Sequence, residues 1–388
     1  MLFKSSIQRD LDRFFKSLYD EDYNIRSVTK SALSQARAKL NPWAFKRLNE
    51  VAVKSFYESA PYLTWRGFRL TGIDGSRIVL PNHPSVREEF GTHAFGPKAD
   101  SERSLAMISM FYDVLNSITI DAQMAPYASS EQDLLLEHSC CFSSGDLLLL
   151  DRGYPNYWLM FYMKAKGIDF CVRLKDDWWL KVREFTKSDE KERVARFSLP
   201  KKDRKKLADY PQMWDKEIEC RLIKVELDNG DTEILCTSLL DAQTYPVHIF
   251  KELYHLRWNE EEAYKLLKSR IELEDFSGKT ATAVKQDFYA KIFMMTLCAA
   301  FSLPIAEKVK AEYKADENRK YTQQINKTSA LANTSEILIA VFLKNQYHKA
   351  IAAFDRIVES TREIVRPNRN IPRNKKPKRT YSMNYKKL

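Results

Sequence analysis

The feature that most constrains the fold is a change of hydrophobic period near residue 68. Before it, segments such as SIQRDLDRFFKSLY carry apolar residues at helical spacing. After it, FRLTGIDGSRIVLP, LAMISMFYDVL and SITIDAQMAP have strand character, and the first is expected to form two strands joined by a turn at Gly75 and Ser76. The strand segments DLLLLDRGYPN and DFCVRLK then flank the helical segment NYWLMFYMKAKG. This order predicts an α/β fold, a mixed sheet flanked by helices.

The first 60 residues are expected to form three short helices. Ser27 is a candidate N-cap for the middle helix, which carries Lys30, Arg37 and Lys39. Three helices of which the middle one is basic are typical of a helix-turn-helix DNA-binding domain, but a plain helical bundle has the same pattern. Residues alone leave both interpretations open.

Composition indicates a polyanionic partner and a reducing compartment. The 388 residues carry a formal net charge of +11, and nine Lys or Arg without an acid fall in residues 366–388. Three prolines exclude a helix through that tail, which is either a solvated disordered segment or a clamp on phosphates. The six cysteines show no C-x-x-C spacing, which predicts a reduced cytoplasmic protein without a zinc knuckle. We expect no signal peptide and no membrane-spanning helix.

The segment YHLRWNEEEAYKLLK, residues 254–268, places selected polar residues on one helical face. At about 100° per residue, a strip about 60° wide holds Tyr254, Arg257, Glu261 and Lys268. Glu260 and Glu262 point away from this strip. The pattern favours either a solvated helix or a functional face built around Glu261.

Two aspartates that end strand segments are candidate partners for Glu261. Asp74 follows the apolar residues of TGI, and Asp151 follows LLLL. Each aspartate alone could simply form a turn. If adjacent strands bring Asp74 and Asp151 together and a later helix brings Glu261, the three carboxylates form an oxygen-rich cluster suited to Mg²⁺.

These residues resemble the DDE transposases of the bacterial insertion-sequence-four family. That family's signature is Tyr, two residues, Arg, three residues, Glu, six residues and Lys, which every gap from Tyr254 to Lys268 matches. Asp151 in LLLLDRGY also matches the family's context for its second acid. The resemblance implies an RNase H-like fold interrupted by a β-rich insertion. The expected division is a helical DNA-binding domain at 1–62, a catalytic domain at 63–175 and 233–283, the insertion at 176–232, a C-terminal helical region at 284–365 and a basic tail at 366–388.

The resemblance also implies an activity. Asp74, Asp151 and Glu261 would be the catalytic residues and would bind two Mg²⁺ ions, with Mn²⁺ as a substitute. Water would cut one strand at the transposon end, and the freed 3′-hydroxyl would attack first the opposite strand, giving a hairpin, and later the target DNA. Implied partners are double-stranded DNA (terminal inverted repeats and target) and a second copy in a homodimeric synaptic complex, with no membrane and with nucleoid association in a bacterial cytoplasm. The expected DNA contacts are Tyr254, Arg257, Lys268, Trp258, Arg152, Lys201, Lys202, Arg204, Lys205 and Lys206.

Alternative interpretations remain open from the sequence. A metal-dependent nuclease without strand transfer would share the acids, and a non-catalytic DNA-binding regulator could retain them. One of Trp178, Trp179 and Trp214 could stack near a flipped base, although core packing is the simpler explanation for each of them individually. His83, His93 and His138 could supply a general base, but no Ser or Cys nucleophile lies in a recognisable elbow.

Overall fold

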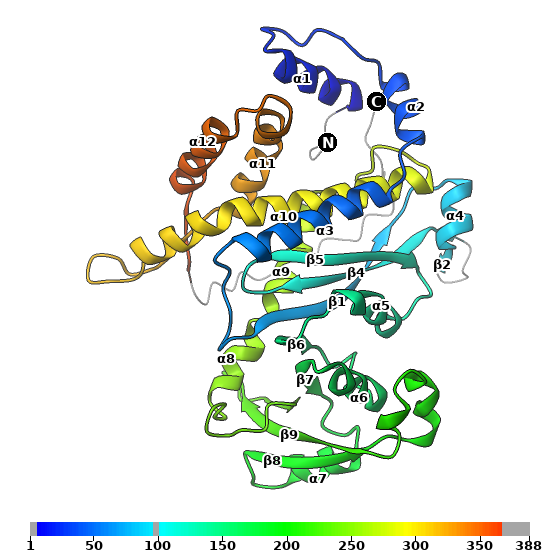
Figure 1. The fold of residues 1–388 in the computed structure, drawn as a ribbon, viewed down its shortest axis with the longest axis vertical. Helices are drawn as coiled ribbons and strands as arrows, with labels where there is room; N and C mark the ends of the chain where they lie inside the picture. Colours follow the sequence, from blue (N-terminus) through cyan, green and yellow to red (C-terminus); the bar gives the residue numbers. More distant parts are fainter. Residues whose placement is uncertain (1–5, 96–100, 367–388) are drawn as a thin grey trace. The chain divides into compact units, whose positions relative to one another are not determined.

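The computed structural model describes residues 6–95 and 101–366 (Figure 1). The predicted basic tail therefore lies, apart from Arg366, outside the described residues. The chain divides into two compact units, which are treated separately below. The first comprises Met1–Ala60, Arg77–Met107 and Tyr264–Leu388, and the second comprises Pro61–Ser76 and Ile108–Ala263.

One mixed sheet of eight strands has the order β5-β4-β1-β6-β7-β10-β9-β8. Its strands are β1 (Arg69–Val79), β4 (Leu105–Asp113), β5 (Ile118–Pro126), β6 (Asp146–Leu150), β7 (Asp169–Leu174), β8 (Glu192–Ser198), β9 (Glu217–Glu226) and β10 (Thr232–Thr237). β6 pairs in parallel with both β1 and β7, whereas β10 is antiparallel to β7 and β9. The predicted mixed sheet with flanking helices is confirmed, and the strand order is consistent with an RNase H-like fold.

Helices of the second unit pack beside these strands. They are α5 (Glu131–Glu137), α6 (Tyr157–Lys166), α7 (Leu180–Lys187) and α8 (Ile249–His255), with short 3₁₀ helices η1 (His138–Cys141), η2 (Lys201–Leu207) and η3 (Pro211–Met213). The four leucines of β6 are completely buried, and most residues of β7 and α6 are buried. The near-continuous apolar run in β6 is therefore explained by a strand covered on both faces.

The first unit is built largely around the long helix α10 (Ala281–Glu312), along which α3 lies (Figure 1). Its other elements are α1 (Ile7–Tyr19), α2 (Lys30–Ala38), α3 (Trp43–Ser59), α4 (Pro84–Phe90), β2 (His93–Phe95), β3 (Ser101–Arg103), β11 (Gln323–Gln324), α11 (Lys327–Leu338), the π-helical turn η4 (Ile339–Leu343), α12 (Tyr347–Ser360) and β12 (Glu363–Ile364). The three predicted N-terminal helices are confirmed. The helix α9 (Trp258–Ser269) contributes residues to both units.

Two local expectations were wrong. β1 runs without a turn through Gly75 and Ser76, because the glycine serves close packing: a Cβ there would lie 2.7 Å from Glu131 Oε1. Thr29, not Ser27, caps α2, since its hydroxyl accepts from the Ala32 N–H.

Among described helices, α10 is long and apolar enough to span a bilayer, although 56% of its most apolar window is buried, as in a core helix.

The segment predicted as an insertion, residues 176–232, contains β8 and β9, which extend the main sheet through β10. It also contains α7 and the 3₁₀ helices η2 and η3. The strands predicted in this segment and at β10 are present, while the domain boundaries given above stay predictions.

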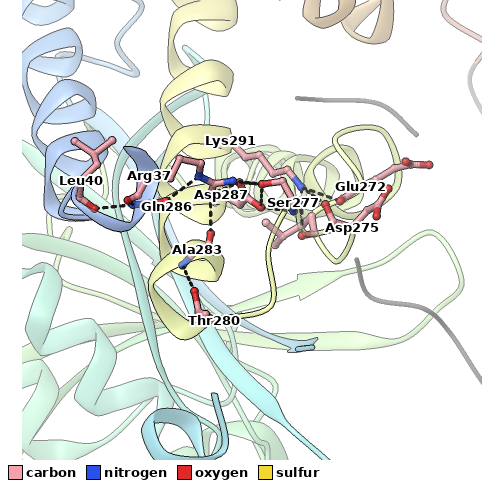
Figure 2. Close-up of polar contacts among 11 residues, drawn as sticks. Arg37, Leu40, Glu272, Asp275, Ser277, Thr280, Ala283, Gln286, Asp287 and Lys291 are labelled. Atoms are coloured by element: carbon pink, nitrogen blue, oxygen red, sulfur yellow. Dashed lines mark hydrogen bonds and ion pairs between the residues drawn. The ribbon is translucent and has the colours of Figure 1, made fainter. Parts of the chain in front are cut away.

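A polar network ties α2 to α10 within the first unit (Figure 2). Arg37 donates to Gln286 Oε1 at 3.0 Å and to Asp287 Oδ1 at 3.1 Å, and it also bonds to the Ser277 hydroxyl. On the same helix, the Lys291 ammonium donates to the backbone carbonyls of residues 272, 273 and 275. The one basic residue of α2 that reaches α10 thus stabilises the unit rather than facing solvent.

Replacing Arg37 with alanine should lower the free energy of unfolding by about 2–4 kcal/mol, because the largely buried Asp287 would lose its charged partner. Urea unfolding followed by circular dichroism measures the loss. Arg47→Ala is the matched control, since its ion pair with Glu50 is exposed and should contribute less than about 1 kcal/mol. Equal losses in the two variants would show that the Arg37 network adds nothing beyond a surface ion pair.

Candidate active site

The parallel pairing of β1 with β6 aligns Asp74 and Asp151. Gly72 of β1 is opposite Leu149 of β6, and each aspartate follows its paired residue by two positions. Because side chains two residues apart share a face of a strand, both carboxylates leave the same face at the same edge of the sheet. Each carboxylate also accepts a backbone hydrogen bond from the glycine that follows it, Asp74 from Gly75 at 2.9 Å and Asp151 from Gly153 at 2.7 Å.

Charge and burial around Asp74 perturb its ionisation. Desolvation by burial is the largest cause and raises the pKa of Asp74 from its ordinary 3.8 to about 6. The Gly75 hydrogen bond lowers the pKa, whereas the Asp151 and Glu131 carboxylates raise it further. A Cβ placed on Gly75 would lie 2.7 Å from Glu131 Oε1, and one placed on Gly153 would lie 3.5 Å from Glu131 Oε2. Glu131 therefore lies close to the backbone beside both aspartates.

The expected single helix through residues 254–268 is broken. α8 ends at His255 and α9 begins at Trp258, and the chain between them has hydrogen bonds that span three residues, such as Glu260 N–H to Arg257 O. Such bonds wind the backbone more tightly than an α-helix, so a projection at 100° per residue fails across the junction. Tyr254 lies before the break, where its buried hydroxyl donates to Leu150 O at 3.2 Å. This bond anchors α8 directly to the strand end that carries Asp151.

Arg257 and Glu261, which were predicted to share a helical face, form an ion pair. The guanidinium donates to Glu261 Oε1 at 2.7 Å, and it also lies 5.7 Å from the Tyr254 ring centroid and 5.8 Å from that of Trp258. Arg257 is buried and Glu261 is partly exposed. Lys268 belongs to the first unit, where its Nζ donates to Arg77 O at 2.8 Å.

Glu260 was predicted to point away from the site, but in the structure its carboxylate lies beside Gly72 and Asp74. The side chain is completely buried, and neither carboxylate oxygen makes a well-formed hydrogen bond. Burial raises the pKa of Glu260 well above its usual range, the Asp74 carboxylate raises it further, and Arg257 lowers it. The break between α8 and α9 explains the error, because it changes which glutamates of the EEE run face the strand ends.

Some basic residues of η2 (Lys201–Leu207) pair with acidic residues of the protein, and the others have exposed side chains. Arg204 donates to Asp215 Oδ1 at 2.6 Å, and Lys206 Nζ lies 3.4 Å from Asp133 Oδ1. The remaining exposed lysines of the run are Lys201, Lys202 and Lys205. Arg152 is also exposed, directly after Asp151.

The candidate tryptophans differ in exposure. Trp178 is 40% exposed, stacks on the buried Trp179 and has Lys175 Nζ 5.3 Å from its ring centroid. Trp214 is half-buried and donates its indole N–H to Leu207 O. Trp258 is 48% exposed. Trp178 and Trp258 are therefore the rings with surface available for stacking.

One other array has the residue types of a nucleophilic triad. His138 Nδ1 lies 2.8 Å from Asp121 Oδ2, and its Nε2 lies 3.0 Å from Ser109 Oγ. All three side chains are buried, so no substrate carbonyl can reach the serine. This array satisfies buried polar groups in the core.

The residues at the strand ends suit a hard divalent cation. Asp74 and Asp151 supply anionic oxygens at one edge of the sheet, and the unpaired oxygens of Glu260 lie close to Asp74. In the described residues, no three His, Cys, Asp or Glu side chains have the arrangement that a metal ion needs. Glu261 is bonded to Arg257.

Comparison with known proteins identifies the family. The family described as Transposase DDE domain matches residues 65–297, more than half of the chain. The chain belongs to this family, and the predicted resemblance to DDE transposases of the insertion-sequence-four family is confirmed.

Two relatives from Escherichia coli (strain K12) are similar in sequence. The transposase InsG for insertion sequence element IS4 is 24% identical over 293 residues, which is 73% of this chain and 63% of InsG. The putative transposase InsZ is 22% identical over 152 residues, 38% of this chain and 50% of InsZ. The chain thus spans less than two thirds of the length of either relative.

A solved structure, the piggyBac transposase synaptic complex with hairpin DNA, is also similar. The match covers 79% of this chain and 59% of the piggyBac transposase chain, at 9% sequence identity and a TM-score of 0.43. This similarity is too low to support an inference.

Replacing Asp74 with asparagine should stabilise the metal-free protein in a pH-dependent way. The folded-state pKa of Asp74 is above its unfolded value, so wild type loses stability as pH rises from about 4 through about 6. Asparagine keeps the acceptor for Gly75 but carries no charge. The variant should match wild type below about pH 4 and exceed it by up to about 3 kcal/mol at pH 7. Urea unfolding in EDTA across this range measures the difference, and a difference that does not change with pH would contradict the assignment.

Proposed function

We propose that this protein is a DNA transposase that cuts DNA at the ends of an insertion sequence and joins the freed ends to target DNA. Asp74, Asp151 and Glu261 are its catalytic carboxylates. The observation that carries the proposal is the register of β1 and β6, which presents Asp74 and Asp151 together at one sheet edge. Membership of the transposase DDE domain family supports it.

The three carboxylates would hold two Mg²⁺ ions, or Mn²⁺ in their place. Bound there, a divalent cation supplies a Lewis acid that activates water and stabilises the leaving oxygen of a phosphodiester. Asp74 and Asp151 would bind the cations from the sheet, and Glu261 would bind them from α9 in place of its present bond to Arg257. The Arg257 guanidinium would then have donors for a DNA phosphate, for which its planar fork is well suited. Assembly of the site would in this way be linked to DNA binding.

Cleavage and joining use the same residues in sequence. Water attacks the phosphodiester at the transposon end and leaves a 3′-hydroxyl. That hydroxyl attacks the opposite strand, which gives a hairpin and releases the flanking DNA, and after the hairpin is opened it attacks the target. The exposed rings of Trp178 and Trp258 offer stacking surfaces for an unpaired base near the cut end. Two ends must be held together for this reaction, so the working complex is a homodimer on DNA in the bacterial cytoplasm, associated with the nucleoid.

A strand-transfer assay tests the proposal. Labelled DNA carrying the ends that flank the gene is incubated with plasmid, with and without Mg²⁺. Wild type should cut and join the ends, whereas Glu261→Gln and Asp151→Asn should bind the ends but lower both steps by at least about a thousandfold, because each removes a metal-binding charge.

Glu262→Gln is the matched control, since Glu262 is exposed on the same helix turn and should leave both steps unchanged. Cleavage by wild type without joining would instead identify a nuclease. Binding by wild type without any cleavage would identify a regulator. Full activity of Glu261→Gln would refute the three-carboxylate assignment.

The exposed lysines of η2 should contact the DNA backbone. Lys205→Ala should weaken binding of end and unrelated DNA alike, and it should reduce the slope of log affinity against log salt by about 1. Fluorescence anisotropy at several salt concentrations gives this slope. Lys187→Ala, an exposed lysine on α7, removes the same charge and should leave the slope unchanged. An equal effect of both substitutions would mean that only net charge matters.

A further inference from the structure

Glu260 is a buried carboxylate for which the proposed chemistry has no role. It occupies the first turn of α9 and has 0% of its surface exposed. Neither of its oxygens makes a well-formed hydrogen bond. Burying a carboxylate without a partner costs several kcal/mol, so a buried carboxylate normally has an ion or a donor opposite it.

The Glu260 carboxylate is directed at β1 beside Asp74. A Cβ built on Gly72 would lie 2.3 Å from Glu260 Oε2, and Gly72 precedes Asp74 by two residues on the same strand. The backbone at Gly72 can approach the carboxylate this closely only because glycine lacks a side chain. The charged groups that act on Glu260 are the carboxylates of Asp74 and Asp151 and the guanidinium of Arg257.

The protein charges around Glu260 do not balance. Arg257 is the cation that acts on it, but Arg257 already donates to Glu261. Asp74, Asp151, Glu131, Glu260 and Glu261 carry five negative charges when ionised, and one guanidinium offsets a single charge. Two divalent cations would offset the other four, and Mg²⁺ accepts several carboxylate oxygens in its shell.

We infer that Glu260 is a fourth carboxylate of the metal site, adding an oxygen ligand from α9 beside Asp74. The inference rests on the proposed function, because it assumes that divalent cations bind at the strand ends. In this arrangement the two adjacent glutamates act differently: Glu261 exchanges between Arg257 and the cation, whereas Glu260, whose carboxylate interacts with the Asp74 backbone N–H beside it, remains directed at the site.

Metal binding without DNA tests the inference. Isothermal titration with Mn²⁺ and thermal unfolding with and without Mn²⁺ are measured for wild type, Glu260→Gln, Asp74→Asn and Glu262→Gln. Without metal, Glu260→Gln should unfold at or above the wild-type temperature, since it replaces a buried carboxyl, whose ionisation burial disfavours, with an uncharged amide. Its affinity for Mn²⁺ should fall by at least about tenfold, with a smaller rise in Tm on adding metal. Glu262→Gln should match wild type in both measurements.

A second variant tests the same point without removing the charge. Gly72→Ala places a methyl group where Glu260 Oε2 lies and should push the carboxylate aside, so that Mn²⁺ affinity falls although every acid remains. Gly72→Ala also keeps the inference testable if Glu260→Gln does not fold.

The outcomes separate this inference from the proposed function. If Asp74→Asn loses Mn²⁺ affinity but Glu260→Gln and Gly72→Ala keep it, Glu260 is only a buried acid and the proposed function stands. If wild type itself binds no Mn²⁺, both are overturned. If Glu260→Gln and Asp74→Asn each lose affinity while Glu262→Gln does not, Glu260 is a ligand.

Discussion

The parallel pairing between β1 and β6 is the constraint on which the candidate site depends. A one-residue shift of this register would turn one aspartate to the opposite face of the sheet. The four leucines of β6 are buried on both faces, so they do not distinguish one register from the next. The ion pair of Arg69 with Asp146, which are partners in this register, opposes such a shift, because the shift would separate two largely buried charges. The bond from the Tyr254 hydroxyl to Leu150 O then fixes α8 to the same strand end. Contacts outside the acidic site thus determine where the acids lie.

Electrostatics at this edge of the sheet work against the stability of the isolated fold. Asp74 and Glu260 are both desolvated and close to further carboxylates, so each holds a proton more tightly than a free acid does. Functional sites commonly retain such unfavourable arrangements, which the rest of the structure compensates. Here the compensation comes from the apolar strands and from Arg257, whose guanidinium lies among aromatic rings and bonds to Glu261.

Much of the site could be predicted from sequence because its signals are local. The apolar run before Asp151 identifies the end of β6, whereas Asp74, predicted to end a strand, lies within β1. The four-residue separation of Arg257 and Glu261 is one that brings helical neighbours together. Features that depend on distant contacts could not be predicted. Gly75 looks like a turn residue, but it lies in a continuous strand because Glu131, far along the chain, packs against it. Glu260 was missed for a related reason, since three-residue hydrogen bonds at the α8–α9 junction leave no mark in the hydrophobic pattern.

The Arg37 network has a practical consequence for dissecting the protein into fragments. A fragment that begins after the predicted N-terminal domain, at residue 63, would lack α2 and would leave Asp287 and Gln286 without the guanidinium that bonds them. The complementary fragment, residues 1–62, would carry α3 without the helix along which it lies. Loss of DNA binding by either fragment would then report a broken hydrophobic and polar contact as much as a missing DNA-reading surface. Point substitutions within the intact chain avoid this ambiguity.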